Sequence, residues 1–145
     1  MLSVQAGKFD PGAVLNTFSK DVGNAGAVVS FTGVVRDDTG DLHHMLIEHY
    51  PGMTEKAIGE MMDTAKDRWN LTACSVIHRH GQLSPNEVIM MVLTASSHRV
   101  EAFAAADYLM DYLKSRAPFW KKEVSAKGDS WVESKDADEA ALDRW

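Results

Sequence analysis

What this sequence lacks excludes several classes of protein. Cys74 is the single cysteine, so the chain cannot form an internal disulfide, and this fits a reducing compartment. The longest mainly apolar run, residues 88–95, is far shorter than the roughly 20 residues that a membrane-spanning helix needs. The sequence does not open on a basic and apolar leader. We therefore expect a cytoplasmic protein rather than a secreted or membrane protein.

Positive charge and nucleotide-binding loops are also scarce. The 15 Lys and Arg residues against 21 Asp and Glu residues give a net charge of −6, which argues against binding nucleic acid through overall charge. Neither G-x-x-x-x-G-K-[ST] nor G-x-G-x-x-G occurs, so these routes to nucleotides are unsupported. With 45% apolar and 25% charged residues, the chain is expected to fold as one domain over residues 1–145.

Metal binding and cysteine chemistry have little support. His78 and His80 lie two residues apart, so a strand would place both rings on one face. No cysteine pair, third ligand or H-E-x-x-H motif accompanies them, and we expect exposed histidines and no metal or other cofactor. Cys74 begins a predicted strand, where a cysteine is usually a small buried apolar residue rather than a nucleophile.

The spacing of apolar residues predicts an α+β fold with a mixed, mostly antiparallel sheet and two to three main helices. Helices are expected from Asp10 to about Val22, from about Thr54 to Trp69, from Ser96 to Ala117, and over 136–145. Strands are expected over 26–36, 43–50, 74–79, 88–95, 119–124 and 130–133. Hairpins are expected to join the first two strands and the last two, with 81–86 as a turn.

The start of the third predicted helix is a candidate anion site. His98 and Arg99 are cations at a helix N-terminus, where they oppose the helix dipole but suit a bound phosphate. The alternative is that Ser97 only caps the helix and Arg99 points into solvent. Arg36 is a further cation, which ends a long predicted strand and lies at the mouth of the predicted hairpin.

A second basic segment follows the same helix. Pro118 ends the helix, and four cations lie within nine residues around it, at positions 114, 116, 121 and 122. The segment could be a solvated basic surface. Alternatively, a lysine amine whose pKa is lowered by burial or neighbouring cations can act on a carbonyl or protonate an anionic intermediate, and Lys114 and Lys121 are the candidates.

Several ordered blocks resemble one family, the large catalytic subunit of molybdopterin synthase (MoaE family). The blocks are Phe31–Arg36, Glu48–Met53, Val76–Arg79 with Gly81, Ser97–Arg99 and Tyr112–Lys121. The resemblance implies an α/β-hammerhead-like domain and a homodimer, each copy binding a small ubiquitin-like subunit to give a heterotetramer. It also implies a sulfurtransferase, which passes sulfur from the C-terminal Gly-Gly thiocarboxylate of that subunit to cyclic pyranopterin monophosphate and forms the molybdopterin dithiolene.

The resemblance also implies roles for individual residues. Lys114 and Lys121 match the catalytic lysines that line the pocket for the partner's tail. Other positions match substrate-binding residues or their immediate neighbours: Val34, Val35, Arg36, His98, Arg99, Lys122 and Glu123. In this family, parts of the site come from both protomers.

Two other functions stay open on the sequence. One is a non-catalytic module that binds a phosphorylated metabolite or a ubiquitin-like tail. The other is a nucleic-acid binder that uses the basic patch from Lys114 to Lys122, with Phe119 and Trp120 for stacking. The acidic net charge makes the second the weaker alternative.

Overall fold

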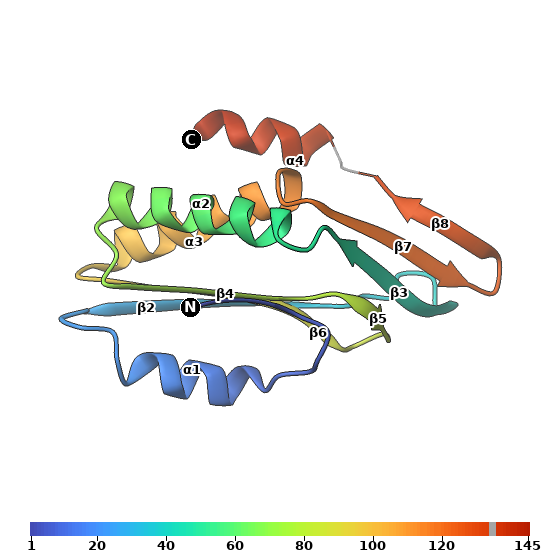
Figure 1. Ribbon diagram of the computed structural model, residues 1–145, viewed down its shortest axis with the longest axis horizontal. Coiled ribbons are helices and arrows are strands. Elements are labelled where there is room, and N and C mark those ends of the chain that lie inside the picture. The colour runs from blue at the N-terminus through green and yellow to red at the C-terminus, as the bar shows by residue number, and fades with distance from the viewer. Residues whose placement is uncertain (134–135) are drawn as a thin grey trace.

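Two four-stranded β-sheets with helices packed on them form the described part of the chain, residues 1–133 and 136–145 of a computed structural model (Figure 1). The strands are β1 (Leu2–Gln5), β2 (Ala27–Val34), β3 (Leu42–His49), β4 (Ala73–Arg79), β5 (Gly81–Leu83), β6 (Val88–Ser96), β7 (Phe119–Ser125) and β8 (Gly128–Val132). The helices are α1 (Pro11–Ser19), α2 (Met53–Trp69), α3 (Arg99–Ser115), α4 (Asp136–Ala141) and a closing 3₁₀ turn (Leu142–Arg144).

The strand order is β1-β4-β6-β2 in the first sheet, called sheet A here, and β5-β3-β7-β8 in the second, called sheet B. All neighbouring strands are antiparallel except the parallel pair β1–β4. Helix α1 covers one face of sheet A, and α2 and α3 cover the other (Figure 1). The predicted mixed and mostly antiparallel α+β fold is confirmed, although the strands divide into two sheets rather than one.

The predicted hairpin between the strands at 26–36 and 43–50 is wrong. β2 pairs with β6 in sheet A, whereas β3 pairs with β5 and β7 in sheet B. The turn between β2 and β3 is closed by Asp37, whose carboxylate accepts hydrogen bonds from the amides of Gly40 (2.9 Å) and Leu42 (3.3 Å). This turn delivers the chain to the other sheet, so a turn signal alone did not identify the strand's partner.

Helix α1 begins where the sequence predicted. The carboxylate of Asp10 accepts a hydrogen bond from the Gly12 amide (2.9 Å), and proline occupies the first helical position. The helix ends at Ser19, short of the expected Val22, and its apolar face at positions 14, 15 and 18 is only partly buried. α1 therefore packs on sheet A without fully burying any of its own residues.

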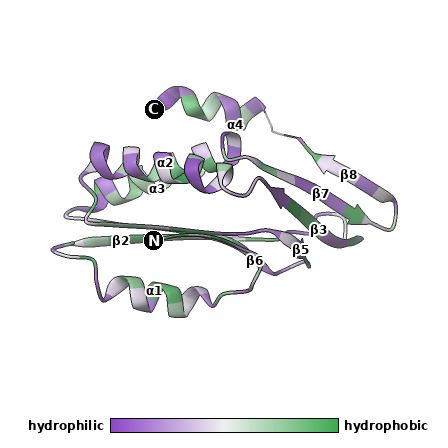
Figure 2. Cartoon of the chain, viewed as in Figure 1, coloured by the Kyte–Doolittle hydropathy of each residue, from purple (hydrophilic) through white to green (hydrophobic). Residues whose placement is uncertain are grey.

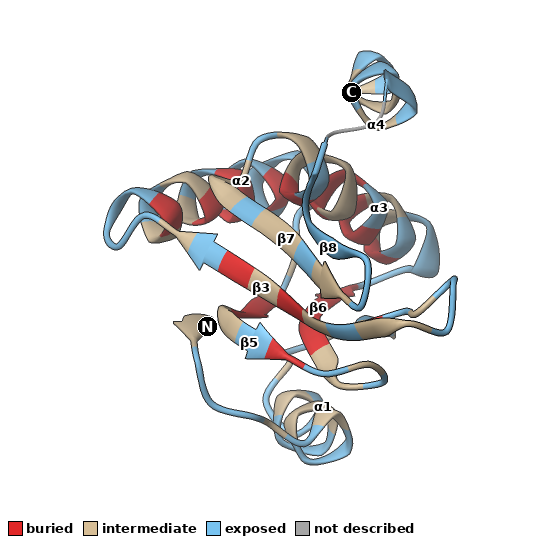
Figure 3. Cartoon of the chain, turned by 90° about the vertical axis from the view of Figure 1, so that its right-hand side faces the viewer, coloured by how far each residue is buried: buried red, intermediate tan, exposed pale blue. Residues whose placement is uncertain are grey.

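The core lies between sheet A and the two long helices. β6 is buried along nearly its whole length, as its apolar sequence predicted, and Ile58, Ala65 and Leu109 from α2 and α3 are fully buried against it and its neighbours. Figure 2 shows hydrophilic residues on the side of α2 that faces away from the sheet. Figure 3 shows buried residues in β3 and β6 and along both helices. In the described part of the chain, no helix is long and apolar enough to cross a membrane.

Two short strands, β1 and β5, were not predicted from the sequence. β1 and β5 have four and three residues, too few for an alternating pattern to stand out, and β5 occupies part of the predicted turn at 81–86.

Cys74 is 4% exposed in β4, and burial raises its pKa to about 11, which keeps the thiol protonated. The expected buried cysteine is confirmed.

The C-terminal residues form the predicted closing helix, and they fold back onto α3. The Arg144 guanidinium contacts Asp107 (3.0 Å) and Asp111 (2.7 Å) on α3. The Trp145 ring packs edge-on to Trp69 and Tyr108. These contacts hold α4 beside the C-terminal end of α3, which carries Lys114.

Candidate functional site

A proline bend brings the two candidate lysines together. Helix α3 ends at Ser115, and the Thr54 hydroxyl donates to the Pro118 carbonyl (3.2 Å), which fixes the bend to the start of α2. Strand β7 then runs back beside β3, opposite Ile47 at position 121. As a result, the charges of Lys114 on α3 and Lys121 on β7 are close enough to affect one another.

The surroundings of Lys121 lower the pKa of its amine below the usual lysine range. Burial is the main cause, because it disfavours the charged form, and repulsion by Lys114 adds to it. The carboxylate of Asp138 on α4 acts in the opposite direction. Lys114 itself is exposed at the last turn of α3. The pair therefore combines an accessible cation with a half-buried amine that loses its proton more easily than a free lysine.

Lys122 lies on the other face of sheet B. Successive residues of a strand point to opposite faces, and the Lys122 amine lies 3.6 Å from the Asp129 carboxylate and 5.4 Å from the centre of the Trp131 ring. It is therefore not brought together with Lys121. Glu123 follows two residues after Lys121 and is exposed, at the rim of a separate hollow.

That separate hollow contains Arg36. It has a volume of about 180 Å³, and Asp37, Asp41, Glu123 and Lys127 are among the residues that line it. The Arg36 guanidinium is exposed and lies 2.8 Å from the Asp38 carboxylate, so a bound phosphate would have to compete with this ion pair.

The backbone beside Arg36 is held in place. Val35 is 1% exposed, its amide donates to the Glu87 carbonyl (2.9 Å), and its carbonyl accepts from the Asn86 amide (2.8 Å). Val34, the other neighbour predicted to bind substrate, is instead exposed at the end of β2. Of the two residues predicted beside Arg36, Val35 is therefore buried and Val34 lies on the surface.

His98 and Arg99 are both exposed at the start of α3. His98 is the N-cap residue with extended backbone, and no side chain caps the helix, so the alternative in which Ser97 caps it is wrong. The Ser96 hydroxyl instead donates to the His98 carbonyl (2.5 Å). The first amides of a helix have no intrahelical partner, and two exposed basic side chains lie beside them here, an arrangement suited to an anion.

Within one chain, this helix start lies far from the other candidate residues. Arg99 and Lys114 are separated by most of α3, about 22 Å at the helical rise. Ala27 pairs with Ser96 at one end of β2, and Arg36 follows the other end, roughly 24 Å away at the rise of a strand. The structure therefore brings Lys114 and Lys121 together but leaves His98 and Arg99 at the opposite end of the molecule.

Sequence reasoning missed the position of His78. It is 4% exposed rather than exposed, its ring stacks on Phe119 with centroids 3.8 Å apart, and its Nδ1 lies 2.8 Å from the Arg79 carbonyl. A carbonyl only accepts, so Nδ1 carries the proton. Burial lowers the pKa of His78 to about 3, and the charge of Lys121 contributes. His78 is thus a neutral neighbour of the lysine pair.

The other histidine of that predicted pair has a different environment. His80 stacks on His49 with centroids 4.0 Å apart, and burial lowers its pKa, helped by the charge of His49. Across residues 1–133 and 136–145, no three His, Cys, Asp or Glu side chains form a group that could hold a metal ion. The signal that the sequence offered for His78 was its place directly after the apolar residues Val76 and Ile77 of a predicted strand.

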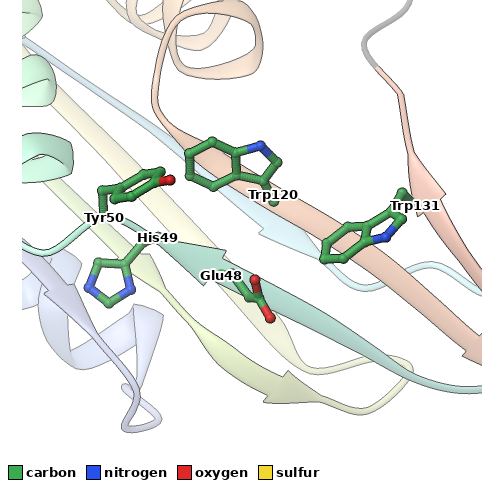
Figure 4. A pocket seen from close by; sticks show the side chains of 5 residues that line it. All are labelled: Glu48, His49, Tyr50, Trp120 and Trp131. Carbon is green, nitrogen blue, oxygen red and sulfur yellow. The ribbon is translucent and has the colours of Figure 1, made fainter.

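An aromatic hollow lies on the outer face of sheet B, opposite to Lys121. It has a volume of about 390 Å³ and is lined by Glu48, His49, Tyr50, Trp120 and Trp131 (Figure 4). Tyr50 and Trp131 are each 53% exposed. Phe119 points to the opposite face and stacks on His78, so it is not available to stack on a base beside Trp120 as the nucleic-acid alternative required.

Comparisons with known proteins agree on one family. The family model described as "MoaE protein" matches residues 4–116. The chain is 62% identical over 142 residues to a molybdopterin synthase catalytic subunit from Cereibacter sphaeroides, covering 98% of this chain and 97% of the relative. It is also similar to a solved molybdopterin biosynthesis MoaE protein from Burkholderia ambifaria, with 42% identity, a TM-score of 0.85 and coverage of 100% and 97%.

A more distant solved structure shares the fold. It is a protein–protein complex of subunits 1 and 2 of a molybdopterin-converting factor from Helicobacter pylori, with 18% identity and a TM-score of 0.80. The match covers 92% of this chain and 91% of that one.

Proposed function

The chain belongs to the MoaE family, and on that premise we propose that Lys114 and Lys121 are the catalytic residues of its sulfur-transfer site. Its activity is that of a molybdopterin synthase catalytic subunit, a sulfurtransferase of molybdenum cofactor biosynthesis. The observation that carries the proposal is the convergence of an accessible lysine and a half-buried lysine with a lowered pKa beside one proline bend. Perturbed amines of this kind are typical of catalytic sites.

Lys114 and Lys121 have different roles in the proposed reaction. In that reaction, the sulfur of a C-terminal thiocarboxylate on a small ubiquitin-like subunit attacks a side-chain carbon of cyclic pyranopterin monophosphate and displaces an oxygen from that carbon. Water then cleaves the bond between the sulfur and the acyl carbon, so the subunit leaves as a carboxylate, and two such transfers build the dithiolene. The exposed ammonium of Lys114 attracts the anionic Gly-Gly tail. Lys121, whose pKa lies below the usual range, holds the anionic intermediate and gives it a proton more readily than an ordinary lysine would. Neutral His78 adds no competing charge beside it.

The phosphate of the substrate requires residues from two chains in this proposal. Arg36 follows β2 near the lysine end of the molecule, whereas His98 and Arg99 are too far away to reach the same ligand within one chain. A homodimer in which His98 and Arg99 of the second copy meet Arg36 would complete the cradle. This agrees with the resemblance, which implied a site built from both protomers.

The partner and location are the finer part of the proposal. We expect each copy to bind one small subunit, giving a heterotetramer, and the Helicobacter pylori complex of two subunits supports a two-component assembly. The proposed chemistry uses only side chains of this protein, the thiocarboxylate and the substrate, with no metal or organic cofactor. The single buried Cys74 suits action in the reducing cytoplasm.

The decisive experiment measures sulfur on the pterin in a purified mixture of this chain, thiocarboxylated small subunit and cyclic pyranopterin monophosphate. Lys114→Ala should fold, dimerise and bind the partner, but lose about a hundredfold or more in rate, the usual cost of removing a general acid or a charge-stabilising group. Lys56→Ala, which removes an exposed lysine on α2, is the matched control and should keep the wild-type rate. Near-normal product from Lys114→Ala would refute the role of Lys114. Tail binding without product in the wild type would support the non-catalytic module instead.

A further inference from the structure

A buried polar ring lies beside the lysine pair. His78 is 4% exposed near the end of β4, just before the chain passes from sheet A to β5 in sheet B. Burying an imidazole costs free energy unless its nitrogens find hydrogen-bond partners. A phenylalanine could keep the stack on Phe119 without this cost. Packing against Phe119 therefore does not require the ring nitrogens of His78, and a role beyond packing is open to them.

One edge of this ring is fixed by the backbone and one face by an aromatic neighbour. Nδ1 donates to the Arg79 carbonyl oxygen over 2.8 Å, and the ring stacks on Phe119 with 17° between the two planes. These contacts fix both the plane of the ring and its rotation. With Nδ1 protonated and the ring neutral, Nε2 is a hydrogen-bond acceptor, and within the described part of the chain no donor is bonded to it.

Strand β7 brings the side chain of Lys121 to this ring. Phe119 and Lys121 are two residues apart in the strand, so their side chains project from the same face about 6.6 Å apart. The ring that stacks on Phe119 therefore lies beside the stem of Lys121, and the charge of Lys121 acts on His78. Among residues 1–133 and 136–145, the Lys121 amine makes no hydrogen bond or ion pair. A rotation within its four-carbon stem would bring this donor to Nε2.

We propose that His78 is a positioning residue for Lys121: its Nε2 accepts an N–H of the lysine amine and holds that amine in one orientation beside Lys114. The inference rests on the proposed function for the role of Lys121. One N–H bonded to the imidazole leaves the other N–H groups of the ammonium for the partner's tail and the anionic intermediate.

A neutral acceptor suits this position better than a carboxylate. The pKa of His78 is about 3, so the ring accepts a hydrogen bond from Lys121 without taking its proton. A carboxylate would favour the ammonium through a full opposite charge, and the lysine proton would become less available to the intermediate. His78 therefore orients the amine while leaving its acidity to burial and to Lys114.

Two amide substitutions separate the roles of the two ring nitrogens. His78→Gln carries an amide oxygen near the position of Nε2, whereas the shorter side chain of His78→Asn reaches only the position of Nδ1. In the sulfur-transfer assay, His78→Asn should lose roughly tenfold in kcat with KM changed by less than about twofold, because positioning acts on the chemical step. His78→Gln should keep about half or more of the wild-type kcat. His80→Gln, which alters the histidine that stacks on His49, is the matched control and should keep the wild-type values.

The pKa of the Lys121 amine gives a measurement that does not require sulfur transfer. Lys114 and Asp138 act on this amine, and His80 acts on His78, so all three charges stay in place in the variants at position 78. Because an acceptor favours the charged form, His78→Asn should lower the pKa of Lys121 by about one unit, as measured by pH-dependent acylation. The fall of kcat at high pH should move to lower pH by the same amount, and His78→Gln should shift both by less than half as much.

The folding of the variants is checked by circular dichroism and urea titration. If His78→Asn does not fold, His78→Phe takes its place, because it keeps the stack on Phe119 and removes both nitrogens. It should show the same lowered pKa of Lys121 and the same loss in kcat.

The outcomes separate this inference from the proposed function. Equal kcat in the wild type and both amide variants would overturn the positioning role while leaving the lysine chemistry in place. Equal losses in His78→Gln and His78→Asn, with the pKa of Lys121 unchanged, would also overturn it, since His78 would then only support the fold. If the wild type transfers no sulfur, the proposed function fails, but a lowered pKa of Lys121 in His78→Asn alone would still support the contact between the two side chains.

Discussion

Mixing two inactive variants should restore activity if the site is shared between copies. Arg99→Ala removes a guanidinium from the start of α3, and Lys121→Ala removes the half-buried amine on β7. About 22 Å of helix separates Arg99 from the lysine end of its own chain, so the two residues cannot serve one site in cis. In a mixed dimer, the site with an intact Lys121 receives an intact Arg99 from the other copy, while the second site loses both.

The size of the recovery follows from this symmetry. Random reassociation of equal amounts gives half of the dimers as mixed dimers, and each has one working site of two. The mixture should therefore reach about a quarter of the wild-type rate per chain, well above either parent. The rate is measured as sulfur transferred to cyclic pyranopterin monophosphate from thiocarboxylated small subunit, after the variants are co-expressed or refolded together.

A matched mixture tests the reasoning. Lys114→Ala and Lys121→Ala affect two residues that lie close together in one chain, so their mixed dimers have one lesion in every site and should not recover. If Arg99→Ala and Lys121→Ala also fail to recover although mixed dimers form, the two residues act in one chain or Arg99 is not in the site. A failure of the Arg99→Ala and Lys121→Ala mixture to recover would therefore refute the shared cradle.

Three further outcomes are expected. The Lys121 amine should titrate below the ordinary lysine value of 10.5, and Lys114→Met should raise its pKa by removing the repulsion, as measured by pH-dependent acylation of the amine. The pKa of His78 is about 3 in the fold, whereas a histidine ordinarily has a pKa of 6.5. The free energy of unfolding should therefore decrease as the pH falls from 6.5 towards 3, because only the unfolded chain binds a proton at this residue. His78→Phe should reduce the loss of stability between pH 7 and pH 5 by about 2 kcal/mol, as measured by urea titration. Gly26→Ala should destabilise the fold by roughly 1 to 3 kcal/mol, because a Cβ at this position would collide with the Ser97 carbonyl oxygen in the loop before α3. Gly59→Ala in α2 is the matched control: a Cβ there meets nothing within 4 Å, so the free energy of unfolding should increase by roughly 0.5 to 1 kcal/mol in the same assay.

Local elements were predictable because their signals are local. Asp10 and the following proline specified the start of α1, and the apolar run of β6 specified a strand buried on both faces. Pro118 specified the end of α3 and the bend into β7. Each depends on residues within one or two turns of the chain, and each was placed within a few residues of its observed bounds.

Pairing and burial were less predictable because they depend on residues distant in the sequence. The signals around Asp37 were those of a hairpin turn, but the strands that flank it join different sheets. His78 reads as one of two surface histidines until β7 brings Phe119 against it. Lys122 is adjacent to Lys121 in sequence and lies on the opposite face of the sheet, where it meets Asp129.

The sequence by itself determined the inventory of this protein: an α+β fold, two groups of cations at α3 and β7, and a family resemblance carried by short blocks. Only the tertiary structure decided which cations share a site. It folds Lys114 and Lys121 together through the bend and places His98 and Arg99 at the far end of the same helix. The physical reason is that a helix or strand fixes distances along the chain, whereas its partners are chosen by the packing of the whole molecule.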